Sequence, residues 1–242
     1  MVDLSPYFQN RPADKPSTVA PARSEQETAG ACQHAANRVY SACLADEDRR
    51  SRTRPPVRLD PEMMSLKCGR ALWFGLNGIR PRSAYGCLAR ALERGRLARR
   101  IVVRDLRRAG YRVDWTGSLE CGYIYGLTRR PHLLEVQPVP DTVFQRLEKF
   151  GLGSAIDLEI VVQCRMGFAR MDRALFVAEN KSTQELHFER VQFDPEIFNQ
   201  VRARVGEVMD FSATPDGTYD EDCAHCCFRA SCREALAAKK AG

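Results

Sequence analysis

The sequence has no apolar run long enough to cross a membrane. Its longest apolar stretches, IDLEIVVQC and RALFVAE, are interrupted by charged residues and fall far short of the roughly 20 residues that a membrane-spanning helix needs. The first residues, MVDLSPYFQNRPADKP, lack a basic segment followed by an apolar one, so they do not resemble a secretory signal. We therefore expect a cytoplasmic protein with no membrane partner.

The absence of an export signal also bears on the ten cysteines. In a reducing compartment, cysteines serve more often as metal ligands or buried thiols than as disulfides. The net charge is +6, and the basic side chains are mainly arginine, which favours planar, bidentate contacts with phosphate or carboxylate. The charge therefore favours an anionic partner such as DNA.

The chain also has no repeat of a fixed period, which argues against a repeat protein. Its 242 residues, 44% hydrophobic and 28% charged, are typical of one sizeable domain with an appendage. Residues 1–23 carry four prolines among polar residues and predict a flexible arm. A helical period over 24–48 and the basic stretch RRSRTRPP follow. We therefore expect an N-terminal arm, helix and basic linker over 1–59 and a larger domain over 60–242.

Helices and strands are mixed in the larger domain. The triplet Asp-Pro-Glu, at residues 60 and 194, predicts two helix starts, because Asp can cap a helix and Pro tolerates its first position. A long helix from Leu88 to Ala109 is predicted to end at Gly110. A further helix is predicted within GSAIDLEIVVQCRMGFARM, and the strand-like segments are YRVDW, GYIYGL, HLLEVQPV, RALFVAE and ELHFERVQF. This order predicts an α/β or α+β sheet with helices packed on it.

Three cysteines near the end of the chain follow a C-x2-C-x5-C spacing that is compact enough to surround one metal centre: Cys223, Cys226 and Cys232. A tetrahedral zinc ion or a four-iron cluster needs a fourth ligand, and no second CxxC pair is present. A zinc site completed by His225 or Cys227 is one interpretation, and a set of unrelated thiols is another. Five other cysteines are expected in the core: Cys32, Cys43, Cys87, Cys121 and Cys164.

A lone upstream Cys68 followed by x-Arg, and then three cysteines near the end, resembles the iron-sulfur motif of AddB-type and CRISPR-associated RecB-like exonucleases. These are a branch of the PD-(D/E)XK nucleases. The resemblance extends from about residue 64 to residue 232, and it implies an α/β fold with a mixed central sheet flanked by helices. It also implies a 4Fe-4S cluster, with zinc as the alternative, on Cys68 and the three later cysteines. Such a ligand set would tie the start of the domain to its end and stabilise it strongly.

The active-site motifs depart from the family pattern. GYIYGL resembles the family strand G-h-I-D-G, and HLLEVQPV takes the place of E-x-K. Glu135 is retained as a remnant, whereas Tyr125 replaces the Asp and Gln137 replaces the Lys. In such a site the two acids hold Mg2+ and the Lys orients or activates water. A neutral phenol and an amide supply neither charge, so we expect weak Mg2+ binding and a pseudonuclease.

Two other family positions are also altered. Gln163 matches the start of the family's Q-x-x-x-Y motif, but Gly167 stands where the Tyr is expected, and an acidic helix position of many relatives aligns near Arg99. The alternative is an active exonuclease with rearranged ligands. Its substitute metal ligand would be Asp114 or Glu120, and its substitute amine would be Lys149 or Lys181.

The helix from Leu88 to Ala109 carries many more arginines than acids. Its apolar side chains are predicted to face the core: Leu92, Ala98, Val102 and Leu106. Four arginines are predicted to face outward: Arg94, Arg100, Arg104 and Arg107. Such a face is often only solvated, but the resemblance implies DNA contact. We therefore expect a DNA-binding protein in a DNA-processing complex, and the other hypotheses are an active exonuclease and a structural subunit that contacts proteins.

Overall fold

The computed structural model describes residues 25–53, 60–79, 86–116, 121–217, 223, 226 and 228–233. The predicted flexible arm and the end of the basic linker lie outside the described residues. By its contacts the chain divides into two units, 1–39 and 40–242. Helix α1 (Glu25–Thr53) crosses this division and extends five residues beyond its predicted end at 48. No helix within the described ranges is both long and apolar enough to cross a membrane.

The larger unit contains a five-stranded mixed sheet with the order β1-β2-β3-β4-β5. Its strands are β1 (Arg112–Thr116), β2 (Cys121–Tyr125), β3 (His132–Val139), β4 (Arg173–Asn180) and β5 (Leu186–Gln192). Only β3 and β4 pair in parallel, and the other three pairings are antiparallel. The predicted α/β fold, with a mixed sheet flanked by helices, is confirmed.

The parallel pair needs a crossover, because two parallel strands cannot be joined by a tight turn. The crossover consists of α5 (Asp141–Phe150), the short 3-10 helix η2 (Leu152–Ser154) and α6 (Ile156–Ala169). The sequence predicted α6 but missed α5. In α5 the apolar residues Phe144 and Leu147 are fully buried on one side of the helix. This amphipathic pattern is the signal that would have identified α5 in the sequence.

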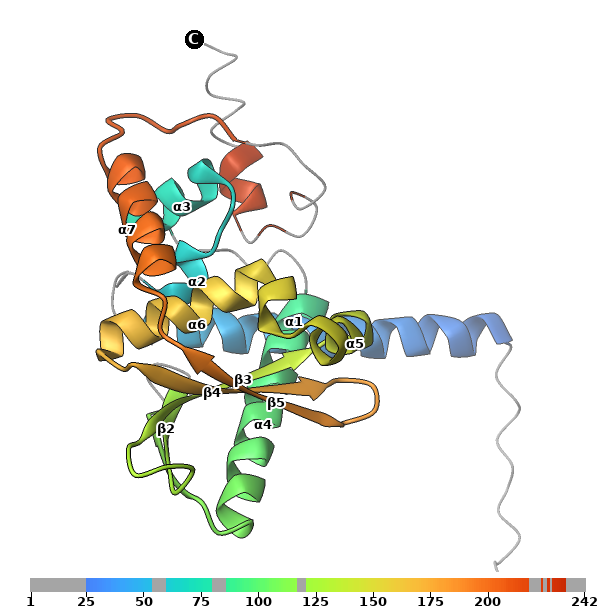
Figure 1. Cartoon of the computed structure of the whole chain (residues 1–242). Helices are drawn as coiled ribbons and strands as arrows, with labels where there is room; N and C mark the ends of the chain where they lie inside the picture. The colour runs from blue at the N-terminus through green and yellow to red at the C-terminus, as the bar shows by residue number, and fades with distance from the viewer. Residues whose placement is uncertain are drawn as a thin grey trace, which may run out of the picture. The chain divides into compact units, whose positions relative to one another are not determined.

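Helices cover the two faces of the sheet as separate layers (Figure 1). Side chains of α5 and α6, including Phe144 and Val162, pack with Leu133 and Phe176 on one face. On the other face, α4 (Gly86–Arg108) packs Val102 and Leu106 against the middle of the sheet. The predicted inward orientation of Val102 and Leu106 is confirmed, whereas Leu92, toward the start of α4, is 44% exposed.

The helix ends follow the predicted chemistry. Asp60 caps α2 (Pro61–Met64) by accepting the N–H of Glu62, and Asp194 caps α7 (Pro195–Met209) by accepting that of Glu196. Gly110 follows α4 with φ of 92°, a conformation that glycine adopts without steric cost. These local signals determine where the main elements of the domain begin and end.

A further apolar cluster lies outside the sheet. In it α2, α3 (Gly69–Leu76) and α7 pack with α6 through side chains such as Met64, Leu72, Cys164 and Val205. Phe228, from the end of the chain, packs against Phe74 of α3. The segments around Cys68 and around the three later cysteines are therefore neighbours.

Candidate functional site

The retained acid of the nuclease-like pattern lies in the middle of the sheet. Glu135 is on β3 and is fully buried, and Gln137, two residues further on, donates from Nε2 to Glu135 Oε1 at 2.7 Å. The two side chains therefore share one face of the sheet, as predicted from the strand period. Instead of an acid and an amine, this face presents an acid and an amide bonded to each other.

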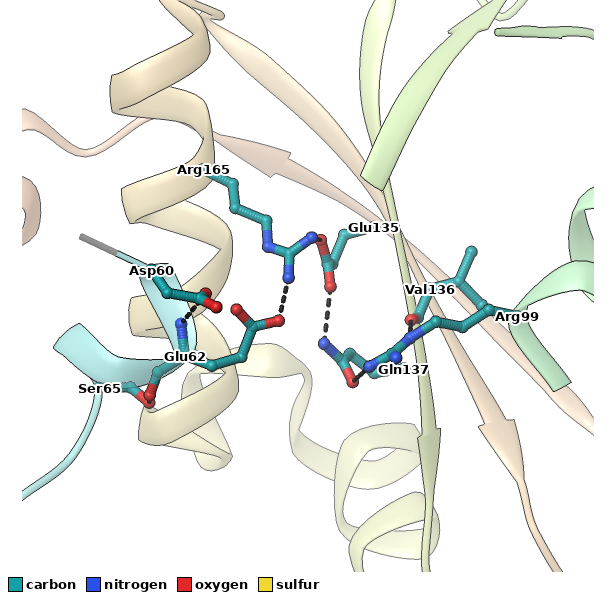
Figure 2. Close-up of polar contacts among 8 residues, drawn as sticks. All are labelled: Asp60, Glu62, Ser65, Arg99, Glu135, Val136, Gln137 and Arg165. Carbon is teal, nitrogen blue, oxygen red and sulfur yellow. Dashed lines mark hydrogen bonds and ion pairs between the residues drawn. The ribbon is translucent and has the colours of Figure 1, made fainter. Parts of the chain in front are cut away.

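Arg165 lies between two carboxylates (Figure 2). It extends from α6, its Nη1 lies 3.1 Å from Glu135 Oε2, and its Nη2 forms an ion pair with Glu62 of α2. The side chain of Arg165 is 4% exposed, so the sheet and helices shield these pairs from water. The sequence analysis missed both Arg165 and Glu62, because the contacts are 30 and 103 residues apart in the chain.

Arg99 approaches the other end of this group. From α4 it donates through Nη2 to Gln137 Oε1 at 3.1 Å and through Nε to the Val136 carbonyl at 3.0 Å. Arg99, the residue near which the resemblance aligned an acidic position, therefore contacts Gln137 and brings a positive charge to this group. The resulting polar network consists of Glu62, Arg165, Glu135, Gln137 and Arg99.

The strand register changes the assignment of the missing acid. Gly122 pairs with Leu134, and Ile124 pairs with His132, so one further step places Cys121 opposite Glu135. Tyr125 lies four residues further along β2, or about 13 Å at the usual rise of a strand. Tyr125, the residue expected in place of the Asp, therefore lies away from Glu135 along the strand, and Cys121 is the β2 neighbour of Glu135.

Burial dominates the electrostatics of this network. It raises the pKa of Glu135 to about 7, although Arg165 acts in the opposite direction. Burial also raises the pKa of Glu62 to about 7, but the Glu62 side chain is 40% exposed, so water offsets part of that effect. Burial raises the pKa of Cys121 as well, which keeps its thiol neutral. The network thus places one guanidinium between two carboxyl groups and beside an uncharged thiol.

Gln163 hydrogen-bonds to backbone groups outside the polar network. It is 2% exposed, donates from Nε2 to the Gln192 carbonyl at 3.0 Å and accepts the N–H of Asp194 at 2.8 Å. These bonds join α6 to the connection between β5 and α7. The structure therefore gives this residue a positioning role in the fold.

Gly167 stands close to an aromatic ring. A Cβ at this position would lie 2.6 Å from the ring of Phe198, and Phe198 is itself held by the rings of Phe168 and Phe193. A side chain as large as tyrosine therefore has no room here unless this cluster moves.

The residues considered for a rearranged active site are dispersed. Asp114 on β1 is exposed and pairs with Arg112 at 3.1 Å, and Lys149 lies over the ring of Phe150. Glu120 is outside the described residues. Lys181, just after β4, is the one described candidate near the network: burial lowers its pKa, and Arg99 adds to this decrease.

The four arginines expected to bind DNA are all exposed on α4. Arg104 forms an ion pair with Asp105 at 3.1 Å. Arg107 donates two hydrogen bonds to the Val113 carbonyl, at 3.1 and 2.8 Å. Arg107 therefore holds β1 against α4, whereas Arg94 and Arg100 extend from the surface of the helix.

The structure brings Cys68 to the three later cysteines. Cys68, Cys226 and Cys232 pack around the same buried aromatic pair, and burial raises the pKa of Cys226, with Cys68, Cys223 and Cys232 adding to the increase. Arg70, the Arg of the Cys-x-Arg motif, donates to the Cys232 sulfur at 3.6 Å and to the Pro215 carbonyl at 2.7 Å. Of the five cysteines expected in the core, Cys121 and Cys164 are buried and Cys43 is half-buried; the side chains of Cys32 and Cys87 are outside the described part.

Within the described ranges, no three His, Cys, Asp or Glu side chains are grouped so that they could hold one metal ion. The cluster expected on Cys68 and the three later cysteines therefore stays a prediction. His225 and Cys227, the alternative zinc ligands, lie outside the described residues.

Comparisons with known proteins identify a similar fold. No family model and no curated protein matches the chain. Among solved structures it is similar to one described as the crystal structure of SSO0001, with a TM-score of 0.50 and 9% sequence identity over 81% of this chain and 94% of that chain. At this identity the likeness shows the fold alone.

Proposed function

We propose that this chain is a nucleic-acid-binding protein with a PD-(D/E)XK fold of the RecB-like exonuclease type, impaired in catalysis and acting in a DNA-processing complex. One observation carries the proposal: Arg165 bridges the buried Glu135 and Glu62. Arg165 supplies Glu135 with the positive charge that a divalent cation supplies in an active nuclease.

The neighbours of Glu135 support loss of catalysis. Mg2+ usually needs carboxylates together with substrate phosphates to compensate for its partial dehydration. Cys121 offers a buried neutral thiol, and Gln137 uses its amide on Glu135 and Arg99. A metal ion here would have to break buried ion pairs, and the two guanidinium groups would repel it.

The cysteine arrangement supports the family assignment. Cys68, Cys226 and Cys232 come from opposite ends of the nuclease-like region and pack against one apolar cluster, and Cys223 is near enough to act on the pKa of Cys226. We propose that these four cysteines hold a 4Fe-4S cluster, and that Arg70 and the backbone N–H of Phe228 donate hydrogen bonds to the ligating sulfurs of Cys232 and Cys226. Bound there, the cluster would fix the last segment of the chain against α3.

A digestion assay tests the loss of catalysis. Wild-type protein and Glu135→Ala should show equal, background cutting of single-stranded and duplex DNA in Mg2+ or Mn2+, because several groups needed for phosphodiester hydrolysis are replaced together. Cutting by the wild type that disappears in Glu135→Ala would refute the pseudonuclease.

A salt titration of DNA binding tests the role of α4. Arg100→Glu should weaken DNA binding and reduce the slope of log affinity against log salt by about one unit, because it removes one phosphate contact. The matched control is Arg202→Glu, an equally drastic charge change at an exposed residue of α7, which should leave affinity nearly unchanged. No binding by the wild type at low salt would favour the structural subunit instead.

A further inference from the structure

Strand β5 forms one edge of the sheet, because among the described strands it pairs only with β4. Its ladder shows which backbone groups remain at the edge. The Phe193 N–H donates to the Asp172 carbonyl at 3.0 Å, and the Asn180 N–H donates to the Glu185 carbonyl at 2.9 Å. Backbone groups alternate along an antiparallel ladder. The odd-numbered residues of β5 therefore face β4, and its even-numbered residues direct their N–H and C=O groups outward.

Two of the outward-facing residues, Leu186 and Phe188, are large and apolar. Phe188 is 48% exposed and Leu186 is 39% exposed, and both line an open hollow of about 510 Å³ between α4 and the sheet. Val102 and Leu106 of α4 and Leu175 of β4 line the same hollow. The hollow exists because α4 covers the middle of the sheet but leaves β5 bare.

The two edge strands of the sheet, β1 and β5, differ in how their outer backbone groups are protected. At β1, Arg107 occupies the Val113 carbonyl with two hydrogen bonds. β5 has the sequence LHFERVQ and contains no lysine or proline, the residues that commonly protect an edge strand from pairing. An edge of seven residues with exposed Leu and Phe is therefore open to a further strand.

We infer that β5 pairs with β5 of a second copy of this chain, joining two sheets across a two-fold axis at Phe188. In this register Phe188 lies opposite Phe188, and Leu186 lies opposite Arg190. All of these residues direct their backbone groups to the edge, so the ladder closes with hydrogen-bonded pairs. His187 lies opposite Glu189 of the other copy, which is an attractive pairing when the His is protonated.

Neighbouring two-fold registers are less favourable. Centring on Glu189 would place Glu189 opposite itself in a non-hydrogen-bonded pair, where side chains are closest. Centring on Arg190 would place two arginines opposite each other, and centring on His187 would place Glu185 opposite Glu189. Like charges directly opposite are destabilising. The charge pattern of β5 is thus self-complementary at Phe188.

Sedimentation velocity over a concentration range from about 1 to about 100 µM tests this interface. The wild type should shift from monomer to dimer, and Phe188→Glu should raise the dimer dissociation constant roughly tenfold or more, because it places two carboxylates together at the axis. The matched control is Phe150→Glu, at a phenylalanine of α5 that is 65% exposed and should dimerise like the wild type. Circular dichroism establishes that both variants fold.

Amide hydrogen exchange distinguishes this interface from any other. The Phe188 and Arg190 amides should exchange more slowly as concentration rises, whereas the His187 and Glu189 amides, already directed to β4, should not change. A wild type that stays monomeric throughout the range, a Phe188→Glu variant that still dimerises, or a dimer without edge protection would each overturn the inference.

Discussion

The buried side chain of Arg165 links two carboxylates that come from separate elements of the fold. It is 4% exposed and contacts carboxylates from β3 and from α2, so it connects the sheet to the helices packed outside α6. Replacing a buried ion pair by apolar groups can be neutral, but removing only one partner leaves an uncompensated charge. The residue therefore matters to the stability of the fold as well as to the charge around Glu135.

Arg165→Met should lower the free energy of unfolding by about 3 to 5 kcal/mol, because Glu135 is left buried without its cation. Adding Glu135→Gln should recover about half of that loss or more, since it removes the stranded charge. Urea denaturation of the wild type and the two variants measures both values. An Arg165→Met protein as stable as the wild type would show that the ion pair contributes nothing.

At the scale of single elements, two helical glycines have opposite surroundings. Gly95 lies within α4 and would present a Cβ to open space, whereas Gly167 lies within α6 against the Phe198 ring. Helix propensity alone favours Ala over Gly by about 1 kcal/mol at either site. The effects of a methyl group at the two sites therefore differ only because α6 packs against α7 at Gly167.

Gly95→Ala should therefore stabilise the protein by about 0.5 to 1 kcal/mol. Gly167→Ala should destabilise it by about 1 to 3 kcal/mol, because the ring cluster must shift to accept the methyl group. Thermal or urea denaturation of the pair measures the difference, and each variant serves as the control for the other. Equal effects at the two sites would contradict the tight contact at Phe198.

At the scale of the whole molecule, the C-terminal segment depends on contacts with α3. Arg70 reaches the Pro215 carbonyl and Cys232, and Phe228 packs on Phe74. The proposed cluster would close a chain loop of well over a hundred residues, from Cys68 to Cys232. Closing so long a loop constrains the unfolded chain strongly.

Cys68→Ser should remove the absorbance near about 400 nm of anaerobically purified protein, together with its iron, because an iron-sulfur cluster needs all four thiolates. The matched control is Cys43→Ser in α1, a half-buried cysteine outside the set, which should keep both. A wild-type protein that is colourless and contains one zinc ion would refute the cluster.

The sequence by itself determined the helix caps at Asp60 and Asp194, the stop at Gly110 and all five strands, because each depends on chemistry within a few residues. It also indicated that Glu135 and Gln137 share a face, which the strand period dictates. Only the tertiary structure decided what surrounds Glu135: Cys121 opposite it, and Arg165 and Glu62 beside it. Those partners come from β2, α6 and α2, and no local pattern encodes which strand register or helix face brings them together. The open edge of β5 was hidden for the same reason, since a strand becomes an edge only when the order of the sheet is known.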